Sequence, residues 1–183
     1  MSLRKEISIR SLVLIPMFSI LIAVCAWIAI PTVIPFSMQT FAVFLALNFL
    51  GSRNGIWAIA VYLLMGLIGV PFFANGTSGI SVLLGPTGGY MIGWFFSGWV
   101  MGMIEKWLGR DIRVQALAML CGLLVCYLFG TAWFMAVYAV TSGPIGLWLA
   151  LCWCVFPFMI PDLVKLGLAL FISQRLRKFK WMP

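Results

Sequence analysis

Histidine is absent from this 183-residue chain, and four acidic residues stand against twelve lysines and arginines. Without histidine, a Ser-His-Asp triad, a Cys-His pair and a histidine-ligated metal site are all excluded. Charged residues make up only 9% of the chain, whereas a soluble globular domain carries about 25%. Because 64% of the residues are hydrophobic, the composition predicts an integral membrane protein in contact with the lipid bilayer.

Cysteine does not supply an alternative active site. All five cysteines lie inside apolar stretches without CxxC spacing and are interpreted as packing residues: Cys25, Cys121, Cys126, Cys152 and Cys154. A single carboxylate lies deep in the apolar stretches, so an aspartyl dyad is excluded as well. We therefore predict no catalytic residue, no metal site and no cofactor.

Apolar stretches, cut at charges and at Pro/Gly clusters, predict six membrane spans: residues 11–30, 35–51, 55–73, 86–104, 114–139 and 146–174. A spanning helix needs about 20 apolar residues, and the first stretch is longer than the apolar region of a signal peptide. Pro157 and Pro161 are expected to break the last span. The fold class predicted is all-α, with residues 1–183 forming a single transmembrane domain of six helices without an internal repeat.

Basic residues mark one side of this bundle. Eleven of the twelve flank the spans on that side: Arg4, Lys5, Arg10, Arg53, Lys106, Arg110, Arg113, Arg175, Arg177, Lys178 and Lys180. The opposite connections, near residues 31–34, 74–85 and 140–145, contain no charge. The positive-inside rule then places both termini in the cytoplasm of a bacterial cell, in its inner membrane, and requires an even number of spans. The excess charge is not gathered on a polar segment, so no nucleic-acid partner is expected.

The connection from Ala74 to Gly85, running on to Tyr90, is the least helical part of the sequence. It contains five glycines, which allow a close approach of the backbone to another group. Two interpretations fit this composition equally: a turn-rich loop, or the wall of a pocket that faces outward. Asn75 and Thr77 lie in this connection.

Asp162 and Lys165 are the ionisable residues that break the charge pattern, and they lie three residues apart in the last span. Residues at this spacing share a helix face. Each costs about 2.5 to 3.5 kcal/mol at membrane depth, so a ligand, a transport pathway or mutual neutralisation must retain them. The structural interpretation is an ion pair that only stabilises the fold. The functional interpretation is a binding site beside a helix break at Pro161.

Gly89, Gly93, Gly98 and Gly102 form two GxxxG spacings in the fourth span, which favour close helix packing. The nearby segment GPTGG is not a phosphate-binding loop, because no Gly-Lys-Ser/Thr follows it. The chain therefore has no sequence with which to hydrolyse ATP.

Four segments of the chain carry a family resemblance: PFSMQTFAVFLA, LGSRNGIWAIAVYLLMGLIGVPFFANGTSG, LLGPTGGYMIGW and PFMIPDLVKLGLA. They resemble the BioY family, the biotin-binding S-components of energy-coupling factor (ECF) transporters. The resemblance implies six helices, an outward-facing site and capture of biotin for uptake. It also implies partner subunits, namely a membrane coupling protein and two ATPases. As ligand contacts it implies Thr77, Tyr90, Asp162, Lys165 and Gln39, and Asn75 is a further candidate in the same loop.

The sequence departs from the family pattern in two places. Ile160-Pro161-Asp162 stands where the family has PGD, and the alanine-rich docking patch on the first helix is replaced by Pro16 and Ile20. Ser19 and Ala23 are then the nearest small pair for docking a partner.

Biotin suits these residue types. A carboxylate accepts from the ureido N–H groups, an ammonium donates to the ureido carbonyl, and aromatic residues cover the bicyclic ring. The backbone N–H groups of Gly88, Gly89 and Tyr90 are candidates for holding the tail carboxylate. Two alternatives remain open: a self-sufficient carrier in which Asp162 and Lys165 couple transport to protons, and an S-component for another vitamin such as thiamine.

Overall fold

A computed structural model describes residues 9–30 and 36–178, and the described part is mostly helical. Its elements are α1 (Ile9–Trp27), β1 (Ala29–Ile30), β2 (Phe36–Ser37), α2 (Gln39–Phe49), α3 (Ser52–Leu67), a 3-10 turn η1 (Ala74–Gly76), α4 (Ile80–Leu84), α5 (Gly88–Leu108), α6 (Ile112–Thr141), α7 (Leu147–Cys154) and α8 (Phe156–Lys178). The two short strands pair antiparallel, with Ala29 opposite Ser37.

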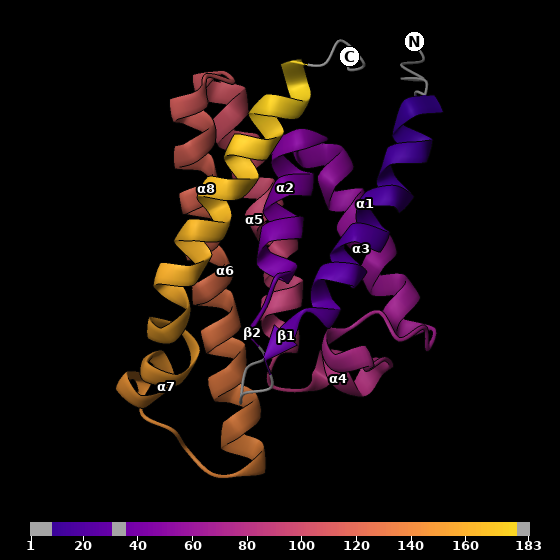
Figure 1. Ribbon diagram of the computed structural model, residues 1–183. Helices are drawn as coiled ribbons and strands as arrows, with labels where there is room; N and C mark the ends of the chain where they lie inside the picture. Colours follow the sequence, from indigo (N-terminus) through magenta and orange to yellow (C-terminus); the bar gives the residue numbers. More distant parts are fainter. Residues whose placement is uncertain (1–8, 31–35, 179–183) are drawn as a thin grey trace, which may run out of the picture.

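The long helices run alongside one another, and the described chain begins and ends at the same end of the bundle (Figure 1). We call this end the terminal end. The start of α1, the turn between α2 and α3, the turn between α5 and α6 and the end of α8 all lie there. The described basic residues outside the pair on α8 belong to these four places, as the charge pattern predicted. Arg4, Lys5, Lys180 and the connection 31–34 lie outside the described residues.

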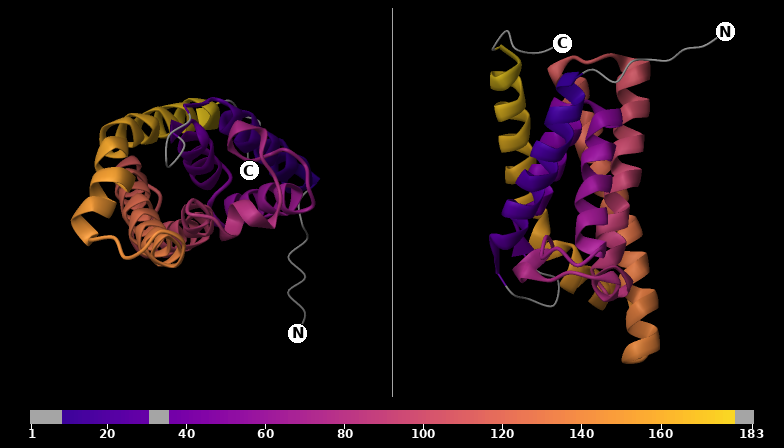
Figure 2. Two further views of the ribbon diagram at one scale, coloured as in Figure 1. Left: turned by 90° about the horizontal axis from the view of Figure 1, so that it is seen from below. Right: turned by 90° about the vertical axis from the view of Figure 1, so that its right-hand side faces the viewer.

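Three described helices are long and apolar enough to cross a membrane: α1, α6 and α8. Helix α2 is apolar but has only 11 residues, a length of about 16 Å. Helix α6 has 30 residues, and its end near α7 extends past the neighbouring helices (Figure 2). The apolar helices confirm a membrane protein in outline, and the count of six spans stays a prediction.

The last predicted span is two helices: the break expected at Pro157 lies two residues earlier, and the break expected at Pro161 is wrong. The chain turns at Val155, between α7 and α8, and Pro161 lies inside the continuous helix α8. Pro157 is the second residue of α8, where the missing N–H of proline would have no helical partner anyway. Asp162 therefore sits within a helix and not at a helix break.

Glycines bring α5 and α6 into close contact, which confirms the packing interpretation of the GxxxG spacings. A Cβ on Gly89 would lie 2.2 Å from Trp133 Cβ, and one on Gly93 would lie 3.3 Å from the Cα of Cys126. On the α6 side, a Cβ on Gly130 would meet the ring of Tyr90 at 2.2 Å. Only glycine allows the two helices to approach this closely.

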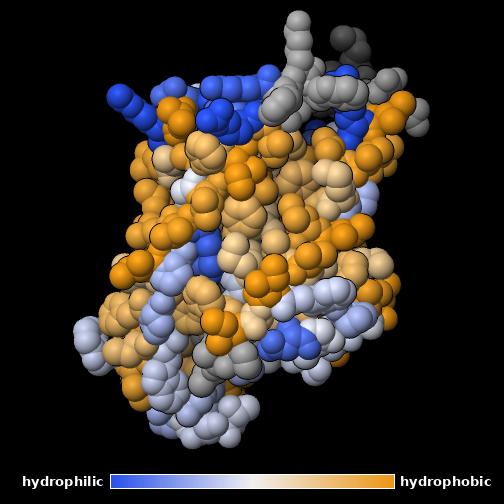
Figure 3. Space-filling model, viewed as in Figure 1, coloured by the Kyte–Doolittle hydropathy of each residue, from blue (hydrophilic) through white to orange (hydrophobic). Residues whose placement is uncertain are grey.

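The surface of the bundle is apolar around its middle, and hydrophilic residues gather at the terminal end (Figure 3). One face of helix α1 belongs to this apolar surface, since its residues Met17, Ile20 and Val24 are exposed. Ser19 and Ala23, the predicted docking pair, are instead buried. The Ser19 hydroxyl donates to the carbonyl of Ala58 over 2.7 Å, so it faces α3. In this structure neither side chain of the predicted docking pair is exposed, and a role in docking stays a prediction.

Candidate ligand-binding site

A buried ion pair lies on α8. Lys165 Nζ is 2.8 Å from Asp162 Oδ1, and each side chain is only 5% exposed. Lys165 also donates to the Ser37 carbonyl over 2.8 Å, and its ammonium lies 4.2 Å from the centre of the Phe36 ring. An ammonium has three N–H groups, and two have acceptors among the described residues. The third has no oxygen acceptor among the described residues, and Lys165 lies in the wall of the cavity described below.

Tyr127 on α6 completes the coordination of the carboxylate. Its hydroxyl donates to Asp162 Oδ2 over 2.7 Å, so each oxygen of Asp162 accepts one charge-assisted hydrogen bond. Sequence patterns did not predict Tyr127 as a site residue, because 35 positions separate it from Asp162. The available signal was the rarity of polar side chains in the predicted span 114–139.

Gln39 lies where β2 passes into α2, and it joins the pair to the aromatic core. Its Nε2 donates to the Tyr62 hydroxyl over 2.5 Å, and its Oε1 accepts from the Ser37 hydroxyl over 3.0 Å. The Tyr62 ring packs against Phe73 and Trp94, at centroid distances of 5.7 and 6.3 Å. The polar groups are thus held by a rigid aromatic wall.

Lys165, Tyr127 and Gln39 line one cavity with a volume of about 290 Å³, close to the lower end of ligand pockets. Its lining is apolar and aromatic with a few polar groups: Ser37, Gln39, Thr40, Phe73, Ala74, Asn75, Thr77, Val82, Thr87, Tyr90, Met91, Trp94, Leu123, Cys126, Tyr127, Cys154, Phe158 and Lys165. Helices α2, α5, α6, α7 and α8 and the connection before α4 all contribute.

The structure brings five of the predicted ligand residues to this cavity: Gln39, Asn75, Thr77, Tyr90 and Lys165. The connection 74–85 therefore forms part of a cavity wall, in line with the second interpretation of its glycines. Asp162 does not belong to the lining and reaches the cavity through Lys165 and Tyr127. The hydroxyl of Tyr90 is paired with that of Thr131 on α6, at 3.1 Å.

Gly88 and Gly89 do not line the cavity. Both are buried at the start of α5, where a Cβ on Gly88 would lie 1.7 Å from the carbonyl oxygen of Leu83. The N–H groups of Gly88 and Tyr90 donate to the carbonyls of Gly85 and Thr87. In this structure the two glycines serve close packing, and these two N–H groups are already used.

Comparison with known proteins gives the same family as the sequence motifs. The model of the BioY family matches residues 2–180. The biotin transporter BioY of Thermotoga maritima is 36% identical over 173 residues, which cover 93% of this chain and 98% of the relative. The probable biotin transporter BioY of Pyrococcus horikoshii is also 36% identical, over 94% of this chain and 96% of the relative.

A solved structure has the same fold. It is the crystal structure of the S-component for biotin from an ECF-type ABC transporter, with a TM-score of 0.83 and 25% sequence identity. The match covers 97% of this chain and 95% of the solved one. From its family-model match, its curated relatives and this fold, the chain belongs to the BioY family.

Proposed function

We propose that this chain is the biotin-binding S-component of an ECF-type importer and captures biotin in the cavity beside Lys165. The observation that carries the proposal is a buried ammonium with a spare N–H in an aromatic-lined cavity, in a chain whose relatives are biotin transporters. An ammonium in a dry pocket is a strong donor to a carbonyl. The chain is not an enzyme, since its family consists of transport proteins.

The cavity offers partners for the ureido carbonyl of biotin and for one of its two ureido N–H groups. Lys165 donates to the ureido carbonyl, while the Tyr127 oxygen, whose proton is directed to Asp162, accepts from a ureido N–H. Asp162 holds both groups in place. The bicyclic ring packs against Trp94, and Asn75 and Thr77 line the wall available to the tail.

Six spans with both termini in the cytoplasm are the arrangement we propose, in the inner membrane of a bacterial cell. The basic residues of the terminal end support this orientation, because positive charge is retained on the cytoplasmic side. The cavity then opens outward. Concentrative uptake requires a membrane coupling subunit and two ATPase subunits, since the sequence contains no nucleotide-binding motif.

Calorimetric titration of biotin into the purified protein tests the binding function. We expect saturable binding of one biotin per chain, and mass spectrometry of protein purified without added ligand should identify biotin as the co-purifying molecule. A titration with thiamine is the matched control. Saturable binding of thiamine and none of biotin would overturn the choice of ligand.

The second candidate is a proton-coupled carrier that works alone, and the buried Asp162–Lys165 pair is the observation in its favour. Reconstitution of the chain alone in liposomes separates the two functions. An S-component binds labelled biotin without accumulating it, with or without a proton gradient. Gradient-driven accumulation would establish the carrier.

A further inference from the structure

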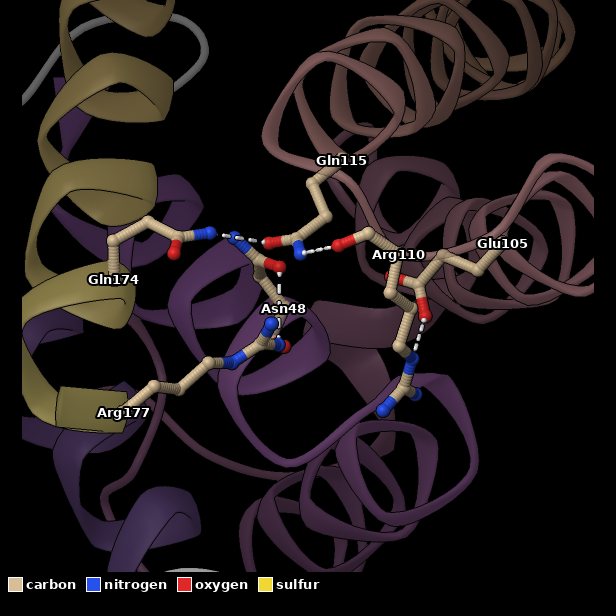
Figure 4. A network of polar contacts seen from close by, with 6 residues as sticks. All are labelled: Asn48, Glu105, Arg110, Gln115, Gln174 and Arg177. Atoms are coloured by element: carbon tan, nitrogen blue, oxygen red, sulfur yellow. Dashed lines mark hydrogen bonds and ion pairs between the residues drawn. The ribbon is translucent and has the colours of Figure 1, made fainter. Parts of the chain in front are cut away.

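A second polar cluster ties three helices together at the terminal end, and none of its residues lines the cavity (Figure 4). We call it the terminal clasp and define it as Asn48 of α2, Gln115 of α6, and Gln174 and Arg177 of α8. Gln174 Nε2 donates to Gln115 Oε1 over 3.0 Å, and Arg177 Nη2 donates to the carbonyl of Asn48. Asn48 and Gln115 are fully buried.

Arg177 acts on α2 as a helix cap supplied by another helix. Asn48 is the penultimate residue of α2, so its carbonyl is one of the last four, which have no partner within the helix. A cation at the C-terminal end of a helix also meets the negative end of the helix dipole. Arg177 therefore joins the end of α2 to the end of α8 through charge as well as through a hydrogen bond.

Helix α8 touches the bundle along a narrow seam. Five of its residues are buried, and they follow a helical spacing: Asp162, Lys165, Leu166, Ala169 and Ser173. In a bilayer the lipid tails are as apolar as leucine, so helix association depends on small-residue packing and on hydrogen bonds. The polar contacts of α8 lie at the two ends of this seam, in the ligand site and in the terminal clasp. Asp162 at one end and Arg177 at the other are about 22 Å apart along α8.

The same pair of helices is joined at both ends of the seam. At one end Lys165 bonds the Ser37 carbonyl just before α2, and at the other Arg177 bonds the Asn48 carbonyl at the end of α2. Among the described residues these are the two residue pairs whose polar contacts tie α8 to α2 and to the strand residue before it. Loss of the clasp contact would leave the Lys165–Ser37 bond as the remaining one.

We propose that Arg177 is a positioning residue for the ligand site, and that the terminal clasp and ligand binding stabilise each other through α8. The inference rests on the proposed function, because biotin is the ligand used to measure the coupling. By linkage, a clasp that strengthens biotin binding must itself be strengthened by biotin to the same extent. Any partner that opens the clasp would thereby promote ligand release.

The test compares three variants of the full chain in calorimetric titrations of biotin. Arg177→Met removes the clasp contact and should weaken binding by about threefold to tenfold. Arg177→Lys keeps a cation and a donor and should recover most of the affinity. Arg175→Met is the matched control: it removes the same charge two residues away from an exposed side chain, and it should bind as the wild type does.

Hydrogen exchange gives a readout that a purely structural role of Arg177 would not change. Saturating biotin should slow exchange of the amides of residues 173–178 in the wild type and in Arg177→Lys, but not in Arg177→Met. The first turn of α1, residues 10–14, lies at the same end outside the clasp and should exchange at the same rate with and without biotin. This difference separates coupling through α8 from general stabilisation.

Each outcome decides between the claims. Wild-type affinity in a folded Arg177→Met, or equal protection of residues 10–14 and 173–178 by biotin, would overturn the coupling and leave the proposed function intact. If Arg177→Met misfolds, hydrogen exchange of the wild type becomes the test. Residues 173–178 whose exchange is not slowed by biotin would then refute the coupling. A wild-type chain that fails to bind biotin would overturn the function and the coupling together.

Discussion

Replacing Lys165 with methionine is the most direct test of the site, because methionine keeps most of the chain length and removes the charge. The change deletes the bonds to Asp162 and to the Ser37 carbonyl, and also the spare N–H that we assign to the ligand. Asp162 keeps Tyr127 as its one remaining donor among the described residues. A buried carboxylate is then left without a counter-charge.

Two magnitudes follow from these contacts. A charge-assisted hydrogen bond to the ligand is worth about 1.5 to 3 kcal/mol, so biotin affinity should fall by about tenfold to a hundredfold. Removing one partner of a buried ion pair typically costs about 3 to 5 kcal/mol of stability. Asp162→Asn should weaken binding by at least about tenfold too, because Lys165 loses its counter-ion. The double variant should lose less than the sum of the two single losses, because the two residues act as one unit.

Calorimetry on monodisperse, detergent-purified variants measures these losses. Tyr127→Phe is the graded comparison, because it keeps both charges and removes only neutral groups: the hydrogen bond to Asp162 and the oxygen that we assign to a ureido N–H. It should cost about threefold to tenfold in affinity. Unchanged biotin affinity in both Lys165→Met and Asp162→Asn would show that the pair has only a structural role.

Three further results are expected. A single cysteine at Ser78 in a cysteine-free chain should react with an impermeant reagent on intact cells, whereas one at Lys178 should not, and the reverse pattern would refute the orientation. Gly89→Ala should cost about 1 to 3 kcal/mol of stability in thermal unfolding, since its methyl group would overlap Trp133, whereas Gly167→Ala has open space and should not destabilise. Gln39→Leu should weaken biotin binding by less than Lys165→Met does, and a loss as large would contradict the assignment of Lys165 as the main donor.

The sequence was informative wherever a physical rule acts on neighbouring residues. The distribution of basic residues predicted that the described chain begins and ends at one end, and the glycine spacing predicted close helix packing of the segment that forms α5. Asp162 and Lys165 could be paired because residues three apart share a helix face. Local rules fail for α8 itself: Pro161 looked like a helix break, yet the chain turns at Val155.

Local rules could not predict the hydrogen-bond partners of Asp162 and Lys165. Tyr127 lies 35 residues from Asp162, and Ser37 lies 128 residues from Lys165, so only the tertiary fold decides that they meet. The same holds for Ser19, where the sequence gives the small size of the side chain but not the face of α1 that carries it. Its burial against α3 depends on which helices are neighbours.

In the site that we propose, Lys165 serves the fold and the ligand with different N–H groups. Two of them satisfy the Asp162 carboxylate and the Ser37 carbonyl, and polar groups inside a membrane protein need such partners when no water is present. The third can meet a ligand without breaking either bond. When the side chains of a site are already ordered before binding, little conformational entropy is lost on binding, so more of the interaction energy contributes to affinity. The ion pair is thus the support that makes the spare donor of Lys165 rigid.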